Sequence, residues 1–421
     1  MDDEYKWHGP CIPSGSDLIP NVPHRNQKLE TVEQSPENQG EMSGRRSRKR
    51  RRSEAIETAL DQISEEFRKY VVVIKHPNGG ASILATDWDE IQKGFDEESQ
   101  KEFATQFVNC GLAEVDNVAV FAMGVVKNAM NYLSNVLWFM ANEYPQMAVK
   151  IGSLSNKQEI TTTTLSAYFK KVCESYGEGT FRYGPLHSIS LVGAKKEECG
   201  RHCPRLIAMI ESFPMFKLLM PWSELSIMDH EESESDDGPI FWVRPGEQTV
   251  PLDYESNASG STGASTKRQS YRKKEIREIF FEDRTHSHCD HTGDGYPTAA
   301  VGFLQNIVDD QRTEKPIVKD VICFHANNFH HVMYSLHLDP YEPPSSQCLQ
   351  WVGEAKLNQL RREGIKYTHL QLQTNDAYFI PRKVIHQFRT INACSTVAWH
   401  IRFRKYYVDG SNVKKRKKEE A

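Results

Sequence analysis

The sequence lacks an apolar run long enough to cross a membrane. Its most apolar stretch, residues 118–140, is interrupted by Lys127 and three asparagines, whereas a membrane span needs roughly 18 or more apolar residues in succession. The first ten residues, MDDEYKWHGP, also lack the charged and then apolar pattern of a secretory signal. We therefore expect no membrane association, and we interpret residues 118–140 as protein core.

Cysteine is too scarce and too scattered to form a disulfide framework. The nine cysteines, an odd number, are spread from Cys11 to Cys394, and this spacing favours free thiols in a reducing, intracellular compartment. Cys199, His202 and Cys203 are three potential zinc ligands. No second cysteine pair accompanies them, so two ordinary thiols are the favoured interpretation.

Positive charge is scarce outside two short runs. The chain has 52 basic and 57 acidic side chains, but seven of the basic ones lie in residues 45–52 and five in residues 414–418. The remainder carries a net charge of about −17, so we do not expect it to bind nucleic acid, because such binding depends on Lys and Arg. A basic peptide is the expected charged partner. The two runs match nuclear localisation signals and predict a nuclear protein with weak DNA contact; solvated tails without function are the alternative.

Composition predicts disordered ends and a mixed α/β first half. Residues 1–53, rich in proline and polar side chains, predict a disordered basic tail, and residues 409–421 form a basic C-terminal tail. Residues 54–228 predict the mixed α/β part of the molecule. Within this part we expect a hairpin at residues 70–85. We also expect three helices, at residues 97–110, 118–142 and 161–175.

The second half begins with a change of composition. Residues 229–274 contain an acidic run and a Ser/Gly-rich stretch, which predict a flexible insertion with a short ordered piece at 241–243. Residues 275–408 are rich in alternating apolar residues and predict an antiparallel barrel or sandwich. The strands we expect there include 377–380, 384–391 and 396–403.

Histidines are concentrated near the C-terminus: ten of the sixteen lie between residues 286 and 400. His288 and Asp290 are two residues apart, so on a strand they would project from the same face. A third ligand is available from His386, on the strand that returns after Pro381. Two histidines and one carboxylate leave coordination positions open, which suits non-haem Fe(II). Zinc more often has a closed tetrahedral set.

Other histidines compete with this assignment. His337-Leu338-Asp339 repeats the same triplet, but prolines follow it, and we interpret it as a strand end that leads into a loop. We favour His288 and Asp290 as the ligands. The remaining histidines near these motifs are expected to support the site or to face solvent as ordinary polar residues: His286, His291, His325, His330 and His331.

Thr285-x-x-His288-x-Asp290, followed by Asp376-x(4)-Pro381-x(4)-His386, resembles the motif of the JmjC, cupin-type 2-oxoglutarate oxygenases. Over residues 54–408, including THSHCDHTGDGYPTAAVGFLQ and NDAYFIPRKVIHQFR, the chain resembles the round spermatid basic protein family, the lysine demethylase 9 type of JmjC enzyme. The resemblance implies an α+β fold with a double-stranded β-helix (jelly-roll) core and an N-terminal helical and mixed region. It also implies a dioxygenase that removes methyl groups from dimethylated lysine twenty of histone H4.

The resemblance assigns roles to individual residues. His288, Asp290 and His386 match the catalytic iron ligands, and Fe(II), 2-oxoglutarate and molecular oxygen are the implied cofactor and cosubstrates. Thr285 matches a hydroxyl that helps to hold the far carboxylate of 2-oxoglutarate. These enzymes usually add a lysine soon after the HxD triplet, but none lies between Asp290 and residue 315. Lys319 is the first candidate for this role; Lys315 and Arg312 are the alternatives.

The implied partner is the histone H4 tail or the nucleosome. A methylated ammonium is recognised by aromatic faces, for which four side chains are candidates: Trp222, Trp242, Tyr296 and Tyr378. Two other functions stay open at this point. One is a 2-oxoglutarate-dependent protein hydroxylase that acts on an unmethylated side chain, and the other is a catalytically inert JmjC-type chromatin-binding module.

Overall fold

The computed structural model describes most of the chain between residues 54 and 407. The described ranges are 54–156, 158–193, 202–228, 231–235, 237–251, 277–290, 297–308, 315–347 and 351–407. The chain divides into two units, Met1–Glu57 and Thr58–Ala421. Of the first unit only residues 54–57 are described, and they are helical. The predicted tails and most of the predicted insertion lie outside the described residues, and all that follows concerns the second unit.

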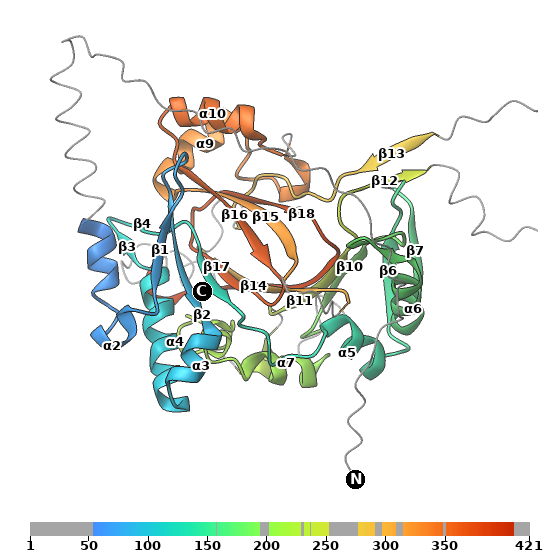
Figure 1. The fold of residues 1–421 in the computed structure, drawn as a ribbon, viewed down its shortest axis with the longest axis horizontal. Coiled ribbons are helices and arrows are strands. Elements are labelled where there is room, and N and C mark those ends of the chain that lie inside the picture. Colours follow the sequence, from blue (N-terminus) through green and yellow to red (C-terminus); the bar gives the residue numbers. More distant parts are fainter. Residues whose placement is uncertain are drawn as a thin grey trace, which may run out of the picture. The chain divides into compact units, whose positions relative to one another are not determined.

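One large sheet of ten strands dominates the second unit (Figure 1). Its neighbouring strands pair antiparallel except for β2 and β5, which are parallel. In spatial order the strands are β1 (Val72–Lys75), β2 (Ser82–Asp87), β5 (Gly124–Lys127), β17 (Ala377–Ile380), β14 (Ala299–Asn306), β19 (Cys394–Ile401), β11 (Ile240–Arg244), β10 (Leu186–Ser190), β6 (Ala148–Gly152) and β7 (Ile160–Thr164). The predicted mixed α+β class, with a large and mostly antiparallel sheet, is therefore confirmed.

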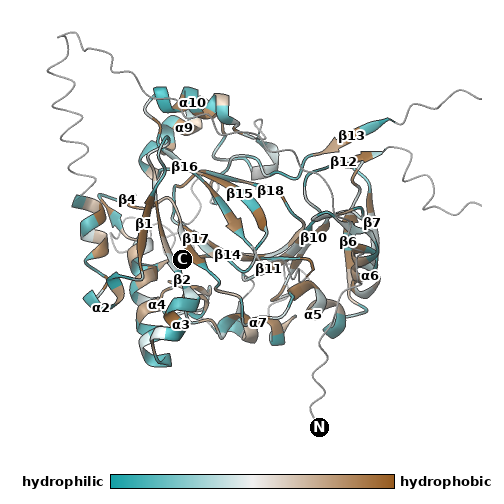
Figure 2. Ribbon diagram, viewed as in Figure 1, coloured by the Kyte–Doolittle hydropathy of each residue, from teal (hydrophilic) through white to brown (hydrophobic). Residues whose placement is uncertain are grey.

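A smaller sheet lies against the large one. It has the order β16 (Tyr367–Gln373), β15 (Ile317–Phe324) and β18 (His386–Thr390), and two isolated bridges place residues 284–288 beside β18. Leu304 and Ile380 of the large sheet share one apolar cluster with Val321 and Leu372 of the small sheet. The core therefore lies between the two sheets, and Figure 2 shows apolar residues along their strands.

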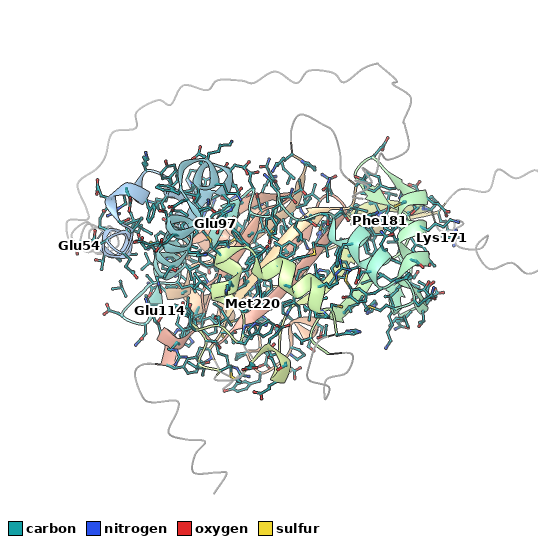
Figure 3. All side chains as sticks on the ribbon, turned by 90° about the horizontal axis from the view of Figure 1, so that it is seen from below. Glu54, Glu97, Glu114, Lys171, Phe181 and Met220 are labelled. Atoms are coloured by element: carbon teal, nitrogen blue, oxygen red, sulfur yellow. The ribbon has the colours of Figure 1, made fainter. Side chains whose placement is uncertain are left out.

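Helices cover the edges and outer faces of the sheets. They are α2 (Glu65–Arg68), α3 (Trp88–Gly94), α4 (Glu97–Gly111), α5 (Val136–Glu143), α6 (Leu165–Ser175), α7 (Pro204–Glu211), α8 (Pro214–Leu219), α9 (Phe329–Leu336) and α10 (Glu354–Arg362). Phe216 of α8 packs against Phe303 of β14 and Trp399 of β19, with ring centroids 5.6 and 5.0 Å away. Figure 3, which labels Met220 directly after α8, shows this helix lying across the large sheet. None of the helices in the described residues is long and apolar enough to cross a membrane.

Three short strand pairs complete the described strands. They are β3 (Glu114–Val115) with β4 (Val118–Ala119), β8 (Tyr176–Gly177) with β9 (Thr180–Phe181), and β12 (Gln248–Pro251) with β13 (Glu278–Phe281). The pair β12–β13 flanks the part of the predicted insertion that is not described.

Two of the predicted helices need correction. Residues 118–142 are not one helix, because β4 and β5 precede α5. Asn128, directly after β5, has φ 62°, a left-handed conformation that interrupts a helix. The helix predicted at 161–175 begins only at Leu165, because the β-branched residues before it form β7. The hairpin near 70–85 and the helix near 97–110 are present as β1–β2 and α4.

The predicted insertion also contains a strand of the core. Strand β11 lies within residues 229–274 and pairs with β19 along its whole length, from Ile240 opposite Ala398 to Arg244 opposite Cys394. The expected ordered piece at 241–243 is thus part of the central sheet. An alternating apolar face makes this possible, because Phe241 and Val243 are fully buried while the alternate residues of the strand line a cavity: Ile240, Trp242 and Arg244.

Candidate metal centre

His288 and His386 lie directly opposite each other at the edge of the small sheet. The backbone N–H of His288 donates to the carbonyl of His386 at 3.1 Å, and the N–H of His386 donates to the carbonyl of His288 at 2.9 Å. Strand β17 ends one residue before Pro381, and β18 begins at His386, so the chain returns as the motif predicts. The two imidazole rings lie 4.5 Å apart.

Both imidazoles present the same nitrogen to the site. The Nδ1 atom of His288 lies 2.7 Å from the carbonyl oxygen of His286, and the Nδ1 atom of His386 lies 3.0 Å from the carbonyl oxygen of Val384. A carbonyl can only accept, so each Nδ1 carries the hydrogen. Each Nε2 therefore has a free lone pair, and a backbone carbonyl fixes this tautomer as it does in many metal sites.

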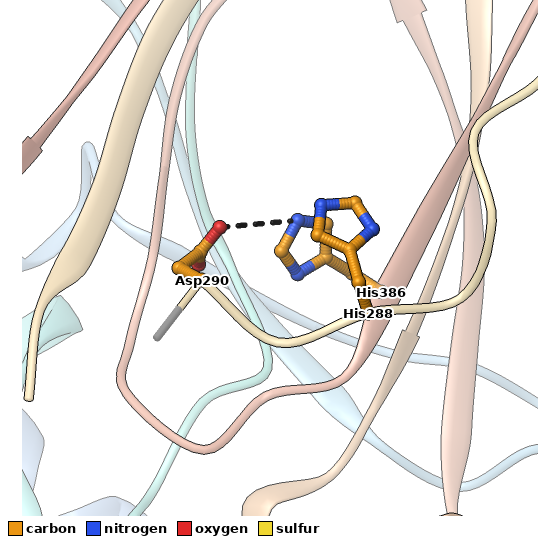
Figure 4. Close-up of side chains that lie close together, drawn as sticks. All are labelled: His288, Asp290 and His386. Carbon is orange, nitrogen blue, oxygen red and sulfur yellow. Dashed lines mark ion pairs between the residues drawn. The ribbon is translucent and has the colours of Figure 1, made fainter. Parts of the chain in front are cut away.

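Asp290 completes a group of three ligand atoms. Its carboxylate lies 3.6 Å from the Nε2 atom of His386 (Figure 4). One ligand atom from each of His288, Asp290 and His386 lies within 4.8 Å of the other two. The side chains of Asp290 and His386 are only 8% and 3% exposed. The structure therefore brings the three predicted ligands together, and the group could bind a metal ion.

The electrostatics leave His288 and Asp290 in the protonation states that a metal requires. Burial, together with the neighbouring His386, lowers the pKa of His288 to about 4. Burial alone would raise the pKa of Asp290, but His386 and a hydrogen bond from His400 hold it below the ordinary value. Near neutral pH the centre thus has a neutral His288 and an ionised Asp290, which are the forms that bind metals.

The ligands line a cavity of about 380 Å³. Thr285 also lines it, and its hydroxyl accepts a 2.8 Å hydrogen bond from the backbone N–H of Phe388. Two of the four candidate aromatic side chains, Trp242 and Tyr378, contribute to the wall. The indole of Trp222 instead donates to Glu211 at 2.7 Å and is not part of the wall. Tyr296 lies outside the described residues.

Lys319 places a buried positive charge in the same cavity. Lys319 is 5% exposed and lines the cavity, and its ammonium lies 5.8 Å from the centroid of the Phe388 ring. Among the described residues no carboxylate forms an ion pair with it; Asp320 pairs with Arg389, and Asp283 pairs with Arg244. A buried ammonium without a counter-charge is costly, so this end of the cavity fits an anionic ligand.

The alternative cations do not reach the cavity or are not described. The ammonium of Lys315 donates to the side chain of Asn131 at 2.8 Å, and Lys315 is not part of the cavity wall. Arg312 lies outside the described residues. Of the three cations considered, Lys319 is therefore the one that the structure places beside the ligands.

The rival triplet lies at a helix end, not at a strand end. His337 is the exposed C-cap of α9, with φ 53°. The carboxylate of Asp339 accepts the backbone N–H of Tyr341 at 2.9 Å. The interpretation as a strand end was wrong, because residues 329–336 bury an apolar helical stripe that includes Val332 and Leu336.

The other histidines and cysteines have separate surroundings. His325 accepts the N–H of Asn327 through its own Nδ1 atom at 3.2 Å, and His330 and His331 are exposed on α9. Burial raises the pKa of the Cys203 thiol to about 12, which keeps that thiol protonated. Cys199 and His291 lie outside the described residues.

Two further residues of the site were not predicted from the sequence. His400 on β19 lies 3.3 Å from the Asp290 carboxylate, and Arg244 on β11 lines the same cavity as Lys319. The alternation of the predicted strand 396–403 puts Ala398 and His400 on one face. Nothing in the sequence says that this face points inward.

The chain matches no family model.

Proposed function

We propose that this chain is an Fe(II)- and 2-oxoglutarate-dependent dioxygenase of the JmjC type, and that it removes methyl groups from dimethylated lysine twenty of histone H4. One observation carries the proposal. Two imidazole nitrogens and one carboxylate converge in a cavity that also holds the buried, uncompensated ammonium of Lys319. A metal with open coordination positions beside an anion-binding group is the arrangement that a 2-oxoacid cosubstrate requires.

The strand order supports a double-stranded β-helix as the core. Numbered along the chain, the eight strands are β11, residues 284–288, β14, β15, β16, β17, β18 and β19. The first, eighth, third and sixth are neighbours in the large sheet, and the second, seventh, fourth and fifth are neighbours in the small sheet. Two four-stranded layers with this alternation are the arrangement expected of a jelly roll.

The donor set fits Fe(II) better than structural zinc. Two histidines and one carboxylate leave positions open, and the ligands border a cavity large enough for a small organic acid. A structural zinc site would instead be closed by a fourth protein ligand, most often a thiolate. Burial raises the pKa of the nearby Cys323 thiol, so that this group stays protonated and is a poor ligand.

The residues of the chain supply binding and orientation for the proposed reaction. Bound iron, 2-oxoglutarate and oxygen would together oxidise an N-methyl group, which then leaves as formaldehyde. His288, Asp290 and His386 hold the metal, and Lys319 with Thr285 would hold the far carboxylate of the cosubstrate.

The same cavity can accept a cationic side chain. Trp242 and Tyr378 offer aromatic faces, which attract a methylated ammonium. The exposed Asp237 lies at the cavity wall, where its charge would favour the approach of a basic peptide. Import into the nucleus and weak contact with DNA are part of the proposal, and they rest on the basic runs at 45–52 and 414–418.

The test compares the wild type with His288→Ala and His337→Ala. We expect the wild type to bind Fe(II) and 2-oxoglutarate under anaerobic conditions and to release formaldehyde from an H4 peptide dimethylated at lysine twenty. His288→Ala should lose metal binding and formaldehyde release, while His337→Ala should keep both. Mass spectrometry of the peptide separates loss of a methyl group from gain of oxygen. A wild-type protein that binds no 2-oxoglutarate would refute the proposal, and one that only adds oxygen would make it a hydroxylase.

A further inference from the structure

We propose that His400 is a positioning residue that holds the Asp290 carboxylate in place for the metal, and that it is not itself a fourth ligand. This inference rests on the proposed metal centre and goes beyond it, because neither the motif nor the ligand spacing points to His400. It follows from three features: the direction of its side chain, the donor in its hydrogen bond, and the position of Asp290 in the chain.

The alternation of β19 directs His400 into the cavity. Ala398 and His400 line the cavity from the inner face of the strand. Trp399 between them packs against Phe216 of α8, and its indole N–H donates to the carbonyl of Leu219 at 2.9 Å. His400 is also paired in register with Ala300 of β14 in the large sheet. The backbone that carries His400 is therefore held by its pairing with β14 and by the packing of the neighbouring Trp399.

The hydrogen bond defines which nitrogen of His400 carries a hydrogen. The Nε2 atom of His400 lies 3.3 Å from an oxygen of Asp290. An ionised carboxylate can only accept, so Nε2 donates and has no lone pair to offer a metal. His288 and His386 have the opposite arrangement, because their Nδ1 atoms face carbonyls and their Nε2 atoms are free. The three histidines thus divide into two ligands and one donor.

Asp290 needs such a donor because its own backbone is outside the sheet. Among the described residues of this segment, the bridge between His288 and His386 is the last one before Asp290. Among the described residues, His400 is the one that donates a hydrogen bond to the Asp290 carboxylate. A ligand carboxylate that turns freely binds a metal more weakly, and hydrogen-bonding partners behind metal ligands typically contribute about 10–100-fold in affinity.

The experiment measures the affinity of the metal-free protein for Co(II) alone, from the visible ligand-field absorption of the bound ion. We expect His400→Leu to weaken binding by about 10–100-fold, because no donor remains. His400→Gln should stay within about threefold of the wild type, because its amide N–H₂ can donate at a similar reach. His330→Leu on the exposed face of α9 is the matched control and should leave the affinity unchanged.

The outcomes separate this inference from the proposed function. A His400→Gln variant as weak as His400→Leu would mean that the imidazole itself is a ligand, and it would overturn the inference. A His400→Leu variant with unchanged affinity would overturn it as well. If His400→Leu does not fold, His400→Asn takes its place, because its shorter amide cannot span the gap and the same weakening is expected. If the His400 variants bind cobalt as expected but the iron-loaded wild type releases no formaldehyde, the proposed demethylase is refuted while the role of His400 stands.

Discussion

Replacing Lys319 by methionine should stabilise the protein while it destroys cosubstrate binding. The Lys319 side chain lies in the cavity, the residue is 5% exposed, and in the described part of the chain no carboxylate pairs with it. The partner that does lie near is the ring of Phe388, 5.8 Å from the ammonium. The folded protein therefore carries the cost of a buried charge that only a bound anion would offset.

The size of both effects follows from this environment. Methionine fills nearly the same space without a charge, and replacing buried ionic groups by apolar side chains of similar volume is often neutral or stabilises proteins by up to about 1–4 kcal/mol. Loss of the attraction to Phe388 removes up to about 1 kcal/mol. We therefore expect the free energy of unfolding to rise by about 1–3 kcal/mol. Removing one partner of a buried charge pair costs a complex about 2–5 kcal/mol, so the affinity for 2-oxoglutarate should fall roughly 30-fold or more.

Urea unfolding of the ligand-free protein and calorimetric titration with 2-oxoglutarate measure the two effects. Lys315→Met is the matched control. The Lys315 ammonium bonds to Asn131 outside the cavity, so that variant should bind 2-oxoglutarate like the wild type. A Lys319→Met variant that is less stable and still binds 2-oxoglutarate would contradict the assignment of this ammonium as the anion-binding group.

Two further predictions test the packing around the site. Burial raises the pKa of Asp376 from 3.8 to about 6, so the protonated form contributes stability that is present below pH 3.8 and is lost as the pH rises through 6. The Asp376→Asn variant cannot ionise at this position and does not lose this stability, so above pH 6 its free energy of unfolding should exceed that of the wild type by about 3 kcal/mol. Urea unfolding should show that the difference shrinks toward pH 4. A difference that does not depend on pH would contradict this prediction. A methyl group on Gly124 would lie 2.2 Å from the buried ring of Phe379, so Gly124→Ala should lower the free energy of unfolding by about 1–3 kcal/mol. Gly177→Ala, with no atom within 4 Å, should change the thermal midpoint little, and equal effects of the two substitutions would refute this account of the packing.

The ligand set was predictable because its signals are local. His288 and Asp290 are two residues apart, and the Asp376, Pro381 and His386 pattern describes a turn between two strands. Such short-range geometry depends on strand parity and on the chain direction after proline. The three ligands could therefore be named before their contact was known.

The helix predicted at 118–142 shows where local reasoning was insufficient. Its apolar residues suit a buried strand as well as a buried helix, and periodicity alone does not separate the two. Strand β5 forms there because Gly124 leaves room for the ring of Phe379 and because β17 and β2 pair on its two sides. Those neighbours are distant in the sequence, so the decision between helix and strand belongs to the packed sheet.

The amino-acid sequence alone was enough to name the kinds of groups at the candidate site, which are two imidazoles and a carboxylate at fixed spacings. It also showed an acidic body with its basic charge in two runs. Only the tertiary structure decided which lysine stands beside the ligands, and which strands supply the cavity wall. In the folded chain β11, which belongs to an acidic segment, pairs with β19, some 150 residues away. The pairing of β19 with β14, another distant strand, placed His400 near Asp290. The physical reason is that a strand's two faces become inner and outer only when a second sheet covers one of them.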